Sequence, residues 1–155
     1  MEGTLDDEAL CARARELFAG AGYACSEAVL AAANERMDDG RRMPDSCIRT
    51  AAGFGGGLAV GDVCGALCGG VMALSLAIAK VSGSATPEEK EERRAAVRRL
   101  YGAFAERFGT TACRELTAEF EAYDDPGRKA KCAEIVEAVA RDLARMLGDA
   151  SQRAE

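Results

Sequence analysis

Apolar residues recur at every third or fourth position along much of the chain, which is the spacing of one face of an α-helix. The first such stripe comprises Leu10, Ala14, Leu17 and Phe18. Thr4 and Asp7 predict the start of this helix, with Asp in the acidic position of a capping box. Gly20 and Gly22 predict its end.

Further stripes follow after loops that contain glycine or proline. They predict helices at about 25–37, 63–80, 87–108 and 128–147, and shorter helical segments at about 47–52 and 111–120. No convincing β-strand and no internal repeat is found. The predicted fold is therefore all-α, with five or six helices packed around the apolar, glycine-rich helix at about 63–80.

Residues with strong capping preferences mark several of these boundaries. Residues 86–89 supply an N-cap threonine, a proline at the first helical position and a capping-box glutamate. Gly109 is expected to end the helix that follows. Asp62 and Thr110 are expected to be the N-caps of the helices at 63–80 and 111–120.

The chain of 155 residues is predicted to form a single helical domain, 1–155, with its core at about 5–147 and a frayed tail at 148–155. Apolar residues make up 48% of the chain and charged residues 30%, a balance that allows a buried core. The net charge of −6 and the absence of tryptophan argue against nucleic acid as a partner.

Residues 63–79 carry no charge, but this stretch has the minimum length for a membrane span and contains glycines and cysteines. We therefore expect a helix buried in a soluble core and no membrane insertion. Residues 1–8 are acidic and lack the basic-then-apolar order of an export signal. The expected compartment is the cytoplasm, where thiols stay reduced.

The absence of histidine excludes Ser-His and Cys-His catalytic pairs, histidine-ligated metal centres and c-type haem attachment through Cys-x-x-Cys-His. No pair of carboxylates stands out from the surface charges, so an ordinary hydrolase is disfavoured. The chain has seven cysteines, an odd number that rules out a framework in which every cysteine forms an intrachain disulfide. Cysteine chemistry is therefore the main candidate.

Four of the cysteines are predicted near the N-termini of four different helices. They are Cys25, Cys64, Cys113 and Cys132. Unpaired amides and the helix dipole stabilise anions there, so we expect thiol pKa values below the free value of about 8.5. Thiolates attack disulfides, undergo oxidation and bind soft metals. The alternative is that each is a small buried apolar residue, although packing alone gives no reason to prefer helix N-termini.

A glycine-rich segment at 53–57 precedes the apolar helix. Without Cβ atoms at Gly55, Gly56 and Gly57, backbone amides can approach an anion, or packed helices can cross tightly. The segment lacks the Lys-Ser/Thr pair of a phosphate loop and the preceding strand of a dinucleotide fingerprint. Gly65 and Gly69 are four residues apart on one helix face and permit close contact with a neighbouring helix.

These motifs occur in a definite order along the chain. The order is Gly22-Tyr-Ala-Cys25-Ser-Glu-Ala-Val-Leu30, Gly53-Phe-Gly-Gly-Gly57, Cys64-Gly-Ala-Leu-Cys-Gly69, Phe108-Gly, Cys113 and Cys132. Over about residues 5–147 the chain resembles the C_GCAxxG_C_C family of putative redox-active proteins. The resemblance implies that the family cysteines are the four named above, with Gly65, Ala66 and Gly69 completing the motif. It implies a redox or metal role, and a related domain occurs joined to haem-binding cytochrome segments.

Three functions are compatible with these residues. In the first, the four cysteines bind an iron–sulfur cluster for electron transfer or redox sensing, with Gly55, Gly56, Gly57, Gly65, Ala66 and Gly69 close to the cofactor. Zinc is the redox-silent variant, although zinc sites usually contain local Cys-x-x-Cys pairs, which are absent here. In the second, the same thiols form reversible disulfides, as in a dithiol oxidoreductase or thiol switch. In the third, the chain is a non-catalytic helical binding module.

The other three cysteines leave these alternatives open. Cys68 lies four residues after Cys64 on the same predicted helix and is a candidate additional ligand or resolving thiol. Cys11 and Cys47 have no role assigned by the pattern. A redox partner protein is expected with either redox function, and a homo-oligomer is compatible with the sequence.

Overall fold

The computed structural model describes residues 2–38, 40–79 and 83–153. Within these ranges seven segments are α-helical, and the predicted all-α fold is confirmed. They are α1 (Glu2–Ala19), α2 (Cys25–Asn34), α3 (Asp45–Ile48), α4 (Gly65–Ile78), α5 (Pro87–Phe108), α6 (Cys113–Leu116) and α7 (Pro126–Arg153). None of them is long and apolar enough to cross a membrane.

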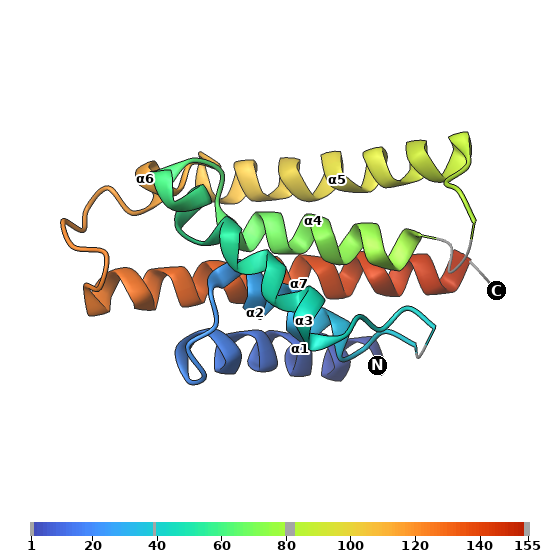
Figure 1. Cartoon of the computed structure of the whole chain (residues 1–155), viewed down its shortest axis with the longest axis horizontal. Coiled ribbons are helices and arrows are strands. Elements are labelled where there is room, and N and C mark those ends of the chain that lie inside the picture. The colour runs from blue at the N-terminus through green and yellow to red at the C-terminus, as the bar shows by residue number, and fades with distance from the viewer. Residues whose placement is uncertain (1, 39, 80–82, 154–155) are drawn as a thin grey trace.

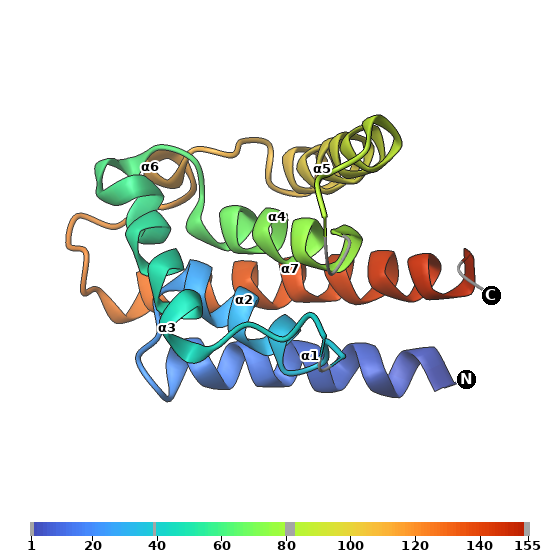
Figure 2. The same ribbon diagram turned by 45° about the vertical axis from the view of Figure 1, so that its right-hand side comes forward.

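The apolar, glycine-rich helix lies at the centre, as predicted. α4 packs against α2, α5 and α7, while α1 packs on the other side of α2 and α7. The long helices therefore run alongside one another from α1 through α7 and α4 to α5 (Figures 1 and 2). The buried side chains of α7 include Ile135, Val136, Val139 and Leu143, which recur at helical spacing.

Glycines of α4 let its neighbours approach on two faces. A Cβ atom at Gly69 would clash with the backbone oxygen of Ser26 in α2. A Cβ atom at Gly70 would lie 2.9 Å from side-chain atoms of both Leu100 in α5 and Val139 in α7. Real Cβ atoms do not approach other atoms so closely, so the absence of side chains at these glycines sets the spacing of the central helices.

The N-cap, the proline at the first position and the final glycine predicted for α5 are confirmed, whereas the Glu89 carboxylate contacts Arg93 and closes no capping box. Thr86 is the N-cap, its side chain accepts a hydrogen bond from the Glu89 amide at 3.2 Å, and Pro87 is the first helical residue. Gly109 ends the helix with φ of 76°, a left-handed conformation that glycine adopts without steric cost.

The expected caps at Asp62 and Thr110 are wrong. Residues 62–64 are extended and pair with 111–113, because the Cys64 amide donates to the Thr111 oxygen at 2.8 Å and the Cys113 amide donates to the Asp62 oxygen at 2.7 Å. This backbone pairing delays the start of α4 to Gly65 and leaves α6 as a single short turn.

Three other helix ends differ from the prediction. α1 already begins at Glu2, ahead of Thr4, and α7 continues to Arg153 rather than ending near 147. α2 ends at Asn34 rather than near 37, because the Asn34 amide group exchanges two hydrogen bonds, of 2.8 and 3.0 Å, with the backbone of Met43. These hydrogen bonds hold the loop between α2 and α3 against the end of α2.

The glycine-rich segment joins two short helical turns, Arg49–Phe54 before it and Gly57–Gly61 after it. Gly56 and Gly57 have positive φ angles, and so do Leu58 and Ala59 at 58° and 60°. A left-handed conformation is costly for residues with a Cβ atom, about 1–2 kcal/mol each. The segment follows this path beside α6, where a Cβ atom at Gly57 would lie 2.7 Å from Cys113 Cβ.

Candidate functional site

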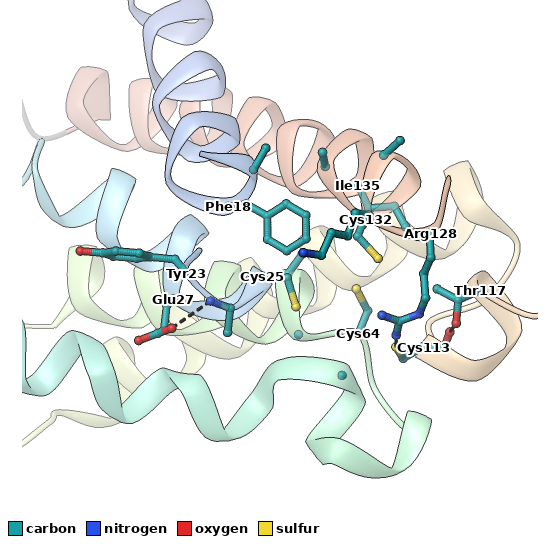
Figure 3. Close-up of a pocket in the computed structure, with 18 of the residues that line it drawn as sticks. Phe18, Tyr23, Cys25, Glu27, Cys64, Cys113, Thr117, Arg128, Cys132 and Ile135 are labelled. Atoms are coloured by element: carbon teal, nitrogen blue, oxygen red, sulfur yellow. Dashed lines mark hydrogen bonds between the residues drawn. The ribbon is translucent and has the colours of Figure 1, made fainter. Parts of the chain in front are cut away.

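Four cysteines from four parts of the chain line one cavity of about 630 Å³, which we call the thiol cavity. These four cavity cysteines are Cys25, Cys64, Cys113 and Cys132. Their sulfur atoms face one another across a common space, between the start of α2, the start of α4, α6 and the beginning of α7 (Figure 3). An apolar part of the same cavity wall is formed by Phe18, Leu116 and Ile135.

Cys25 is the first residue of α2, and glycines surround its sulfur. The backbone amides of Gly56 and Ser26 are oriented to stabilise its thiolate, while burial raises the pKa of the thiol by a larger amount. A Cβ atom at Gly65 would lie 2.5 Å from Cys25 Sγ. The motif glycine is therefore what leaves room for this sulfur atom.

Cys64 is the N-cap of α4 and is fixed through its backbone bond to Thr111. The amides of Leu67 and Ala66 in the first turn favour its thiolate. Burial dominates and raises the pKa of Cys64 to about 12. Negative charge on Cys25 or Cys113 would raise it further.

Cys113 begins α6 and is the one cavity cysteine found in contact with a side-chain cation among the described residues. Arg128 Nη2 donates to Cys113 Sγ at 3.7 Å. The same guanidinium donates to the Tyr123 backbone oxygen at 3.1 Å and stacks over the Tyr123 ring at 4.1 Å from its centroid. Figure 3 shows Arg128 reaching from α7 to this sulfur.

Cys132 lies one helical turn after Arg128 on α7. Burial raises the pKa of its thiol, and Arg128 and Lys131 oppose that change. Charge on Cys25 or Cys113 acts on it as well, so the cavity cysteines are electrostatically coupled.

The expectation that helix N-termini would lower the thiol pKa values is wrong for Cys25, Cys64 and Cys132. Backbone amides act in the expected direction at Cys25 and Cys64, but loss of hydration is the larger effect at all three. Thiolates gathered here would also repel one another. The cavity therefore favours either protonated thiols or a positively charged group that the thiolates share.

All seven cysteines are free thiols. Among the residues that the structure describes, no three Cys, Asp or Glu side chains converge closely enough to hold one metal ion. Tetrahedral zinc binds sulfur at about 2.3 Å and needs its four ligands almost in contact with one another. The described residues thus present no ready-made site for a single metal ion.

The remaining predicted site residues divide into two groups. Gly56, Gly65 and Ala66 line the thiol cavity, whereas Gly55, Gly57 and Gly69 do not. Gly57 and Gly69 instead make close contacts with Cys113 and with α2.

The three other cysteines lie outside the cavity lining. Cys68 is half-buried one turn further along α4, Cys11 is buried in the core, and Cys47 is exposed. Burial raises the pKa of the Cys68 thiol, and negative charge on Cys25 would raise it further.

Sequence reasoning missed Arg128 and Tyr123. The spacing of four residues between Arg128 and Cys132 places both on one face of a helix, which was a usable signal. Tyr123 lies in the loop before α7, and its contact with Gly56 depends on how distant segments pack.

The cavity cysteines all fall within the part of the chain that matches a family model. The model is described as "Putative redox-active protein (C_GCAxxG_C_C)" and matches residues 23–146. Comparison with curated proteins and with solved structures found no match.

Proposed function

Because the chain belongs to the C_GCAxxG_C_C family of putative redox-active proteins, we propose that its four cavity cysteines hold an iron–sulfur cluster for electron transfer or redox sensing. One observation carries the proposal: thiols from four separate elements face a single cavity, where the Arg128 guanidinium contacts Cys113. Four cysteine thiolates are the usual ligand set of such clusters, which supply one-electron chemistry.

The size of the cavity supports a group larger than a metal ion. Its volume of about 630 Å³ lies in the range of small-molecule sites. A cluster would be held by the thiolates of the four cavity cysteines, which all line this space.

The surroundings of the sulfur atoms also support the proposal. Bound cysteine ligands are deprotonated, so their charge must be offset inside a buried site. Arg128 at Cys113, and the amides of Gly56 at Cys25 and Leu67 at Cys64, are placed to do this. Phe18, Leu116 and Ile135 shield the same space from water and thereby strengthen these interactions.

An anaerobic preparation tests the proposal. The reduced protein, reconstituted with ferrous iron and sulfide, is expected to show sulfur-to-iron absorbance and to retain both elements after desalting. Cys→Ser variants at each cavity position should lose iron, while Cys47→Ser, at an exposed position outside the cavity, should keep it. A colourless, iron-free wild-type protein would overturn the cluster assignment.

The second candidate is a dithiol function without metal, and it is supported by the free thiols that line one cavity. Two cavity thiols would form one disulfide and release two protons and two electrons to an oxidant such as a disulfide. Mild oxidation would then remove about 2 Da per pair, reversibly with dithiothreitol. A cluster-free protein that keeps seven titratable thiols after oxidation contradicts this alternative.

Either redox function needs a partner that supplies or accepts electrons. We propose a redox protein in this role and the cytoplasm as the compartment, because reduced thiols persist there. Mixing the reduced protein with candidate carriers and following the cluster absorbance tests the exchange.

A further inference from the structure

A second cavity of about 430 Å³ lies directly beside the thiol cavity. Its walls come from the glycine-rich segment, α6, the loop after α6 and the start of α7, and it shares Gly56, Cys113, Thr117, Tyr123 and Arg128 with the thiol cavity. We call it the arginine cavity, because Arg114 and Arg128 line it.

Neither arginine forms an ion pair with a carboxylate of the described residues. The ion pairs found there engage other cations, and the Arg128 guanidinium donates to a backbone oxygen and to a sulfur atom. On a chain with net charge −6, where acidic residues outnumber basic ones, two such arginines on one cavity are unexpected. Glu121 lines the same cavity without pairing to either.

The backbone opposite the arginines has little side-chain bulk. Gly55, Gly56, Ala59 and Gly61 form this wall. A Cβ atom at Gly61 would lie 2.9 Å from Arg114 Cβ, so this glycine allows Arg114 to pack against the segment. The stacking on Tyr123 fixes the plane of the Arg128 guanidinium. A fixed guanidinium plane binds planar or tetrahedral oxyanions through paired N–H donors.

We propose that the arginine cavity binds a small molecule bearing an oxyanion, a phosphate, sulfate or carboxylate group, between Arg114 and Arg128. The anion then lies beside Cys113, which lines both cavities. This site goes beyond the proposed function, since it requires neither iron nor a disulfide. In this site the glycine-rich segment forms part of the wall that surrounds the anion.

Isothermal titration of reduced, iron-free protein with inorganic phosphate, sulfate and acetate tests the site. Saturable binding is expected for at least one of the three, and the preferred anion identifies the ligand class. Arg114→Gln and Arg128→Gln should each weaken binding by at least about tenfold, the effect of losing a charged hydrogen bond. Glu121→Gln should tighten binding, because a repelling carboxylate is removed.

Arg94→Gln is the matched control, since Arg94 is an exposed arginine on α5 away from both cavities. It should leave the affinity unchanged, and thermal melts should confirm that all variants fold. The proposal is overturned if none of the three anions saturates the wild-type protein, or if Arg94→Gln weakens binding as much as the cavity variants do. Iron content is measured separately, so failure of the cluster proposal does not affect this result.

Discussion

Gly65 and Cys25 are in such close contact that a Cβ atom at position 65 would lie 2.5 Å from the cysteine sulfur and 2.7 Å from the Phe54 backbone oxygen. Gly65→Ala should therefore displace Cys25 or separate α2 from α4. We expect a loss of about 1–3 kcal/mol in the free energy of unfolding, the usual cost of overpacking. Iron retention after reconstitution should fall as well.

Gly102→Ala is the control for this substitution. Gly102 lies in α5, and a Cβ atom added there would meet no atom of the described residues within 4 Å. Alanine there should stabilise the helix by up to about 1 kcal/mol. Urea denaturation of both variants measures the difference in their free energies of unfolding. Equal stabilities would show that a Cβ atom at position 65 can be accommodated beside Cys25.

Local signals in the sequence were sufficient to predict the helical framework. Thr86, Pro87 and Gly109 act through residues within one turn of themselves, so their effect could be predicted without tertiary information. Asp62 and Thr110 carry equally good capping signals, but residues 62–64 and 111–113 pair with one another, which no local pattern encodes. At these positions the tertiary hydrogen bonds outweigh the local preference of Asp and Thr for helix N-caps.

The same distinction applies to the site. The motif in the sequence was sufficient to predict the four cavity cysteines. It also predicted Gly65, which is part of the same motif. Sequence reasoning about helix N-termini gave the wrong direction for three thiol pKa values, because burial depends on the packing of all four elements. Arg128 was missed for a similar reason, because its side chain contacts Cys113 on a different element of the fold.

Cys68 is expected to be dispensable for the cluster. It lies one turn beyond Cys64 on α4 but is absent from the lining of the thiol cavity. Cys68→Ser should keep iron and sulfide at the wild-type level, while Cys64→Ser, four residues away, should lose most of both. Elemental analysis of the two variants after identical reconstitution makes the comparison. Loss of iron in Cys68→Ser would make it a ligand and revise the four-cysteine assignment.

Arg128 should raise the reduction potential of the proposed cluster. A positive charge beside Cys113 favours the reduced state, which carries one more negative charge. Arg128→Gln should therefore lower the midpoint potential, by an amount on the order of tens of millivolts. Arg128→Lys keeps the charge and should recover part of the shift. Redox titration followed by absorbance measures the potentials, and identical values for wild type and Arg128→Gln would exclude the electrostatic role.

Cys11 should make the stability of the iron-free protein sensitive to alkaline pH. Burial raises the pKa of this core thiol above its ordinary value, an effect that Arg141 opposes and that Glu137 and Asp7 reinforce. Above about pH 9 the unfolded chain releases the Cys11 proton while the folded chain retains it, so deprotonation favours unfolding. The contribution of Cys11 to stability is thus fully present at lower pH and declines as the pH rises, by at most about 1.4 kcal/mol per pH unit.

Comparison with Cys11→Ala isolates this effect, because other titrating groups are shared. At about pH 8 the wild-type protein should be the more stable by about 1 kcal/mol, since the substitution leaves a small cavity in the core. The difference should narrow by about pH 10, where the unfolded wild-type chain is stabilised by releasing the Cys11 proton that the folded chain retains. Cys47→Ala, which removes an exposed thiol, is the control variant measured at the same pH values. A difference for Cys11→Ala that does not change with pH would mean that water reaches the Cys11 sulfur in the folded protein.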